Sequence, residues 1–159
     1  MKRILVAILV LLVFIPTTVG AVVPGQNSRE DIRTDAEIIA KVLYEECRGV
    51  ESKTEQAAVA WCILNRVDSQ KFPNTVEKVA KQSRQFAWNP SAPVTEELLN
   101  LAEDVLLRWQ LEKVGMGDVG RILPQEYLYF AGRGGHNHFR NAYKGGEYWN
   151  WTLESPYES

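Results

Sequence analysis

Cysteine and histidine are scarce in this chain of 159 residues, which holds two of each. His136 and His138 are spaced so that a strand would put both rings on one face, as in many metal sites. The sequence has no further histidine and no His-Glu-X-X-His helix to complete a zinc centre. A zinc-dependent amidase or peptidase stays an alternative, but we expect no metal and no other cofactor.

The two cysteines, Cys47 and Cys62, fall near the end of one expected helix and well inside the next. In an antiparallel helix pair these positions differ in height, and a disulfide tolerates little misalignment. Two small buried thiols are the simpler expectation, with a disulfide as the alternative. A cysteine peptidase is disfavoured, because Cys47 would lie at the negative end of its helix, where a thiolate is destabilised.

Positive charge is not concentrated anywhere in the sequence. The chain has 18 Lys and Arg against 20 Asp and Glu, and removing Lys2 and Arg3 leaves 16 basic residues and a net charge of −4. A protein that follows a row of phosphates needs a basic block. Nucleic acid is therefore not an expected partner.

Long apolar runs are absent apart from residues 4–15, which follow the basic pair Lys2-Arg3. With residues 16–21 after it, this run has the three zones of a secretory signal peptide, and we expect residues 1–21 to be cleaved off. The run is shorter than the roughly 20 residues that cross a bilayer, so we expect membrane contact only through an uncleaved signal segment. The mature protein is expected to be secreted.

The rest of the chain has the size of one domain with a single core. Residues 22–33 are polar and lack periodicity, which is typical of a flexible lead, and the domain is expected over 34–159. Its patterns predict an α+β fold that is mostly helical, with one small β-hairpin.

Two helices open the expected domain. A capping box over 34–37 predicts the first helix at about 35–48, with Gly49 as its C-terminal stop. A second capping box, over 52–55, leads into the alanine-rich segment 56–67. Because this segment is apolar almost all round, we expect it to be the central helix.

Two further helices and the hairpin follow. Asn74 is the expected N-cap of a short helix over 75–82, and a fourth helix is predicted over about 95–111. Residues 127–131 and 136–140 are predicted strands around a glycine turn. The tail beyond them is rich in aromatic residues, which either cover the core edge or line a groove.

Two adjacent glutamates near the end of the first helix face different ways. Glu46 shares the apolar face of Leu43, whereas Glu45 follows Lys41 by four residues and is expected to pair with it in solvent. A carboxyl held against hydrocarbon at the negative end of a helix has a raised pKa. Glu46 is therefore the candidate general acid. A structural carboxyl, bonded to Arg66 or to a backbone amide, is the alternative.

In order and spacing, five blocks of the sequence resemble the SleB-type cell-wall hydrolases, the family of the spore-cortex-lytic enzyme. The blocks are Tyr-Glu-Glu-Cys-Arg-Gly (44–49), Gln-Ala-Ala-Val-Ala (56–60), Leu-Asn-Arg-Val (64–67), Phe-Pro-Asn-Thr-Val (72–76) and Gln-Phe-Ala-Trp (85–88). Residues 129–130 and 136–140 resemble the family's closing strands more loosely. The resemblance covers about residues 37–140.

The resemblance implies a lysozyme-like fold and, as substrate and partner, the glycan strands of peptidoglycan. Glu46 matches the family's catalytic acid/base. In the family's lytic transglycosylase reaction, this acid protonates the glycosidic oxygen and then helps the muramic acid's own 6-hydroxyl attack, which gives a 1,6-anhydro product. The substrate contacts that we expect are Gln85, Phe86, Trp88, Tyr129 and His138.

The sequence also departs from the family pattern. Glu45 replaces a glycine, Cys47 an alanine and Val50 a glutamate, and the missing acid at position 50 affects substrate contact. Ala87 replaces the serine of Gln-Phe-Ser-Trp. Phe86 and Trp88 beside it either plug the core or form a platform on which a sugar ring stacks.

Two functional alternatives stay open beside the transglycosylase. A hydrolytic lysozyme on the same fold needs a second carboxylate, for which Asp68, Glu126 and Glu147 are candidates. A wall-binding module would keep the fold without turnover. The motifs do not say whether the target is spore cortex or vegetative wall, whether the protein acts in germination, or whether a regulatory protein controls it.

Overall fold

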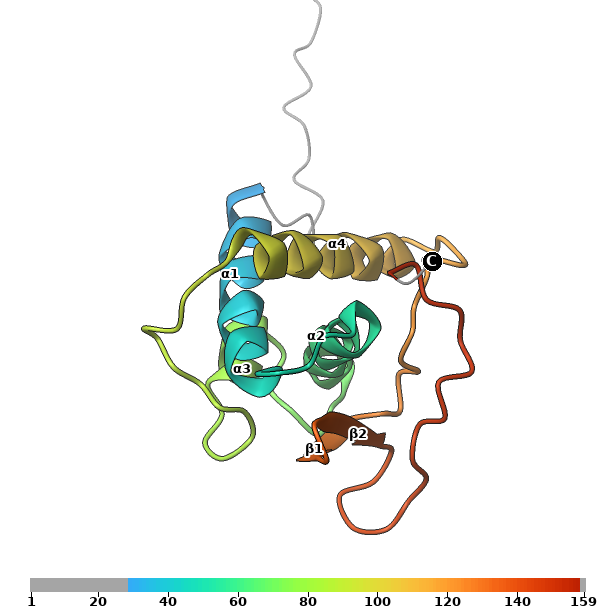
Figure 1. The fold of residues 1–159 in the computed structure, drawn as a ribbon. Coiled ribbons are helices and arrows are strands. Elements are labelled where there is room, and N and C mark those ends of the chain that lie inside the picture. Colours follow the sequence, from blue (N-terminus) through green and yellow to red (C-terminus); the bar gives the residue numbers. More distant parts are fainter. Residues whose placement is uncertain (1–28, 158–159) are drawn as a thin grey trace, which may run out of the picture.

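The computed structural model describes residues 29–157, in which four α-helices precede a two-stranded antiparallel hairpin (Figure 1). A mostly helical domain with one small hairpin is thus confirmed. The signal peptide expected over 1–21 and residues 22–28 of the expected lead lie outside the described residues. Within the described part, no helix has the length and apolar character needed to cross a membrane.

Helix α1 spans Arg29–Glu46 and begins earlier than predicted. The Thr34 hydroxyl donates to the carbonyl of Glu30 at 2.9 Å, one turn back within the helix, and so does not cap a helix start. The predicted start at residue 35 is therefore wrong, and residues 29–33, expected in the flexible lead, are helical. The helix ends at Glu46, two residues before the predicted end, and the predicted stop at Gly49 is present, with a φ of 78°.

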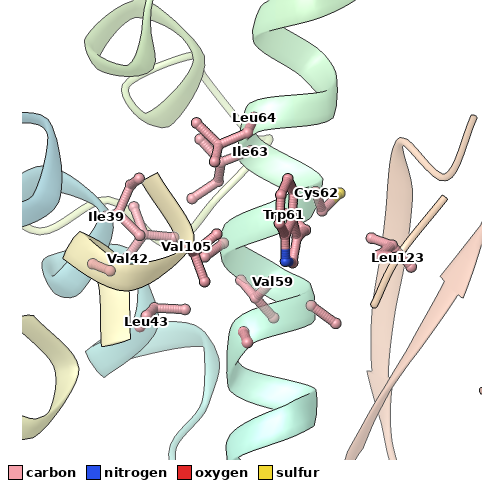
Figure 2. Packing of buried hydrophobic residues seen from close by; sticks show 14 of the residues in the cluster. Ile39, Val42, Leu43, Val59, Trp61, Cys62, Ile63, Leu64, Val105 and Leu123 are labelled. Carbon is pink, nitrogen blue, oxygen red and sulfur yellow. The ribbon is translucent and has the colours of Figure 1, made fainter. Parts of the chain in front are cut away.

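Helix α2 spans Lys53–Asp68 and runs through the middle of the domain (Figure 1). The Ser52 hydroxyl accepts a hydrogen bond from the backbone N–H of Glu55, which confirms the predicted cap. Its alanines let the other helices approach closely, and Trp61 is fully buried. Figure 2 shows the result: side chains of α1 (Ile39, Val42 and Leu43) and of α4 (Val105) lie against the α2 side chains.

Helix α3 spans Val76–Ala80, and helix α4 spans Glu96–Lys113. The N-cap of α3 is Thr75, not Asn74 as predicted, because it is the Thr75 hydroxyl that accepts from the N–H of Lys78. The helix is also shorter than the predicted 75–82. Thr95, predicted as the start of the fourth helix, is its N-cap.

Strands β1 (Tyr129–Arg133) and β2 (His136–Arg140) are joined by Gly134 and Gly135. Both glycines have positive φ, 65° and 81°, as a two-residue hairpin turn requires. Strand β1 starts and ends two residues later than the predicted 127–131, because Gly132 and Arg133 pair with β2 and belong to the strand. The tail then pairs with β2 through an Arg140–Tyr148 bridge and returns to α4 (Figure 1), where the Tyr157 hydroxyl donates to Asp104 Oδ2 at 2.8 Å.

Both cysteines are free and buried, in agreement with the simpler expectation. Burial raises the pKa of the Cys47 thiol to about 12 and that of the Cys62 thiol to about 11. Neither thiol is therefore suited to act as a nucleophile near neutral pH.

Candidate active site

Glu46 is the last residue of α1, and its side chain is half-buried. The backbone N–H of Ala87 donates to its Oε1 at 2.5 Å. Burial raises the pKa of the Glu46 carboxyl, while the Ala87 N–H and the positive charge of Arg66 oppose the rise. The net shift is upward, as a general acid needs. The contact with Ala87 also fits the structural alternative, in which a backbone amide holds the carboxyl.

Glu45 does not pair with Lys41, so that prediction is wrong. Glu45 accepts hydrogen bonds from Asn89 Nδ2 at 2.9 Å and from Arg48 Nη2 at 2.5 Å, and its side chain is only 12% exposed. Lys41 Nζ instead donates to the carbonyl of Pro90 at 2.8 Å. An exposed i,i+4 ion pair contributes only a few tenths of a kcal/mol, so contacts with a neighbouring loop displace it. The end of α1 thus holds the loop 85–90 by three side chains.

Arg66, near the end of α2, gathers the loop and the hairpin around one buried cation. It is 3% exposed, and its Nε donates to the carbonyl of Leu128 at 2.6 Å. Its Nη1 donates to Gln85 Oε1 at 3.2 Å. The guanidinium lies over the rings of Phe72, Phe86 and Tyr129, at 4.8, 4.5 and 5.7 Å. Three of the predicted site residues, from two separate segments, therefore meet at Arg66.

Phe86 and Trp88 differ in their surroundings. Phe86 is 8% exposed and packs against Phe130 with ring centroids 5.9 Å apart, so it plugs the core. Trp88 is half-buried, with Lys81 Nζ 5.3 Å from the centre of its ring. Only Trp88 of the two leaves part of its ring open to a ligand.

His138 lies on the solvent side of β2. Its Nε2 is 3.2 Å from the carbonyl of Arg133, and its ring meets Tyr148 edge-on at 6.3 Å. These contacts place His138 on the outward face of the hairpin rather than at Arg66.

Glu55 is a buried carboxylate that the sequence reasoning assigned only to a capping box. It is 5% exposed, accepts a hydrogen bond from the backbone N–H of Asn137, and lies 3.0 Å from His136 Nδ1. Asn137 Nδ2 in turn lies 3.5 Å from the carbonyl oxygen of Glu46. Glu55 therefore ties the start of β2 to the first turn of α2, and Asn137 ties it to the end of α1. Glu55 lies between polar neighbours in the sequence, so nothing local indicated that its side chain is buried.

The three carboxylates proposed as partners of Glu46 lie in other contacts. Asp68 accepts from Trp109 Nε1 at 2.8 Å and pairs with Lys113. Glu126 lines the same surface hollow as Asp68, of about 460 Å³. Glu147 pairs through its backbone with the residue after β2.

Two other hollows lie between α2 and α4 (about 350 Å³) and beside the end of α1 (about 450 Å³), and Glu46 lines none of the three. Over residues 29–157, no group of three or more His, Cys, Asp or Glu side chains is placed to hold a metal ion.

Comparison with known proteins links the sequence to enzymes of the cell wall. Residues 50–117, from just before α2 to just after α4, match the family model described as Cell Wall Hydrolase. The spore cortex-lytic enzyme of Bacillus cereus is 44% identical over 71 residues, which are 45% of this chain and 26% of that protein. The spore cortex-lytic enzyme of Bacillus subtilis is 41% identical over 68 residues, 43% of this chain and 21% of that protein.

The chain thus spans about a quarter of the length of these curated relatives. No solved structure matches it. The family match begins after Glu46, so the role of that residue depends on its geometry and on the resemblance of residues 44–49.

Proposed function

The chain carries a cell wall hydrolase domain with distant similarity to spore cortex-lytic enzymes, and on this premise we propose that it cleaves peptidoglycan as a lytic transglycosylase. We propose a lysozyme-like fold, with Glu46 as the single acid/base. The protein acts outside the cytoplasm, exported by a signal peptide over residues 1–21.

The observation that carries the proposal is the setting of the Glu46 carboxyl. The carboxyl belongs to the last residue of α1 and is half-buried. Burial raises its pKa, although the positive charge of Arg66 opposes the rise. A carboxyl with a raised pKa keeps its proton closer to neutral pH and can donate it to a leaving oxygen.

The proposed reaction uses the Glu46 carboxyl twice, first as an acid and then as a base. Glu46 gives it to the glycosidic oxygen as the bond between that oxygen and the anomeric carbon breaks. The 6-hydroxyl oxygen of the same muramic acid then bonds to the anomeric carbon, and its proton passes to the Glu46 carboxylate. No water is consumed, the product carries a 1,6-anhydro ring, and Glu46 is protonated again.

The other carboxylates near this end of α1 favour a mechanism with one acid. A glycosidase that uses water has a second carboxylate, about 5–5.5 Å away for retention or 6.5–9.5 Å away for inversion. Glu45 has one oxygen on Arg48 and the other on Asn89. Glu55 is likewise engaged through both oxygens, by the hydrogen bonds to the start of β2. Both carboxylates are held by these hydrogen bonds and little exposed, Glu45 at 12% and Glu55 at 5%, which disfavours activation of a water, so the hydrolytic lysozyme is the second candidate.

We propose that substrate is contacted along the loop and the hairpin. Gln85 and Tyr129 lie at Arg66, and Trp88 follows in the loop that holds Glu46. Phe86 supports this surface from below, since it is buried. His138 would meet a part of the strand further from Glu46.

Product analysis tests the proposal. The full chain is incubated with purified peptidoglycan in water enriched in ¹⁸O, and the released fragments are weighed by mass spectrometry. We expect anhydro-muropeptides without ¹⁸O. Reducing ends that carry ¹⁸O would assign the hydrolytic lysozyme instead, and binding to the wall without any product would assign a wall-binding module.

A further inference from the structure

The outward side of the hairpin forms a surface of cationic and aromatic side chains. Residues of β2 alternate between exposed and buried, with Asn137 and Phe139 inside and the histidines outside. Because Tyr148 pairs with Arg140, it continues the outward side. We define the outer hairpin face as Arg133, His136, His138, Arg140, Tyr143 and Tyr148.

The charge of this face is opposite to that of the chain. The whole chain has a net charge of −2, whereas the six residues of the outer hairpin face include Arg133 and Arg140 and no acid. Lys144 lies in the same segment, which Glu126 and Glu147 flank. The face thus presents two arginines, which would attract carboxylates.

Large rings on this face are open to solvent. Tyr143 is 68% and Tyr148 61% exposed. Tyr143 meets the Tyr129 ring at 5.8 Å, and the Arg140 guanidinium lies 5.7 Å from the centre of the Tyr148 ring. Exposed rings held in place by neighbours mark a binding surface rather than a solvated edge.

The face is continuous with the candidate active site. Tyr129 contacts both Tyr143 and the Arg66 guanidinium, so the rings extend from the Glu46 neighbourhood outward. A polymer held on the outer hairpin face would therefore run toward Glu46.

We propose that the outer hairpin face binds the peptide stems of the wall polymer, with its cations on the stem carboxylates and its tyrosines against the sugar rings. The identity of the polymer as peptidoglycan comes from the proposed function, and the inference rests on it. A neutral glycan would give the arginines nothing to pair with, whereas carboxylates repeated along a strand match the Arg133 and Arg140 guanidiniums.

Binding to purified sacculi, freed of phosphate-bearing polymers, tests the inference. The full chain carries Glu46→Gln so that the sacculi are not consumed. Arg133→Glu should weaken binding about three- to tenfold at low salt, as for one or two exposed ion pairs reversed. The difference in affinity between the parent and Arg133→Glu should disappear near 1 M salt, where the screening length is about 3 Å. Tyr148→Ala should weaken binding about threefold at both salt concentrations.

Matched controls lie elsewhere on the surface. Lys78→Glu reverses an exposed charge on α3, and Leu107→Ala removes a side chain on α4 that is 52% exposed. Both should bind like the parent protein. Equal binding by Arg133→Glu and Lys78→Glu would overturn the inference.

Amidating the stem carboxylates with a carbodiimide and an uncharged amine separates the possible ligands, because it removes the charge and leaves the strand intact. The parent should lose affinity for the amidated sacculi, and Arg133→Glu should bind them no more weakly than the parent does. Unchanged parent binding to the amidated sacculi would overturn the inference, as would binding that depends on the phosphate-bearing polymers instead. Cleavage by the unsubstituted chain is measured in parallel: a lack of product with the expected binding pattern would refute the proposed function and leave the binding face standing.

Discussion

Arg66→Met should be among the most damaging single substitutions in this domain. Methionine fills the space of the arginine stem but removes the charge-assisted hydrogen bond to Leu128 and the one to Gln85. A hydrogen bond from a charged group contributes about 1.5–3 kcal/mol, and a desolvated cation over an aromatic ring about 0.5–2 kcal/mol. Burial of the methionine thioether offsets part of this loss, so we expect the free energy of unfolding to fall by about 3–4 kcal/mol.

Urea denaturation measures this loss. At an m-value of about 2 kcal/mol per molar, the unfolding midpoint should fall by about 1.5–2 M. Lys78→Met, on the exposed side of α3, is the control and should leave the midpoint nearly unchanged. A fall of less than about 0.5 M in Arg66→Met would refute the idea that Arg66 joins the loop 85–88 to the hairpin.

Three further predictions concern the acid, the thiols and the tail. Because a general acid works in its protonated form and burial raises the pKa of Glu46 above its ordinary 4.5, kcat/KM should decline as pH rises through that higher pKa; a decline already complete at pH 4.5 would contradict this. Cys47 and Cys62 should resist a thiol reagent at pH 8 in the folded protein and react in urea, and fast labelling of the folded protein would show that burial is wrong. Gly146→Ala should lower Tm by several degrees more than Gly145→Ala. Both glycines have positive φ, but only at Gly146 would an added Cβ meet other atoms, the nearest at 2.5 Å. Equal Tm values for the two variants would contradict the described turn.

Features set by neighbours in sequence were predictable. The cap at Ser52, the stop at Gly49 and the cap at Thr95 depend on a few adjacent residues, and all three are present. The N-cap of α3 could not be predicted from the sequence, because two neighbouring residues, Asn74 and Thr75, both suit that position. In the structure the N-cap is Thr75. Thr34 led to a wrong start for α1, because a threonine inside a helix can donate a hydrogen bond to the carbonyl one turn back.

Features set by distant segments were not predictable. Asn89, one of the two partners of Glu45, lies 44 residues away, and the partner of Glu55 at the start of β2 lies 82 residues away. The other partner of Glu45, Arg48, lies within helical spacing. Helical spacing suggested Lys41 for Glu45 and a cap for Glu55, since it contains no information on loops that fold back. The inward direction of Glu46 was accessible because it depends only on the face of one helix.

The rate of peptidoglycan cleavage by Glu46→Gln tests the central claim most directly. Glutamine keeps the shape of the side chain and still accepts from the Ala87 N–H, but it has no proton to give. Glu37→Gln is the control, since Glu37 lies on the same helix in an exposed pair with Arg33. We predict that Glu46→Gln cleaves at least about a hundredfold more slowly with an unchanged unfolding midpoint, while Glu37→Gln keeps full activity. Full activity in Glu46→Gln would contradict the assignment of Glu46 as the acid.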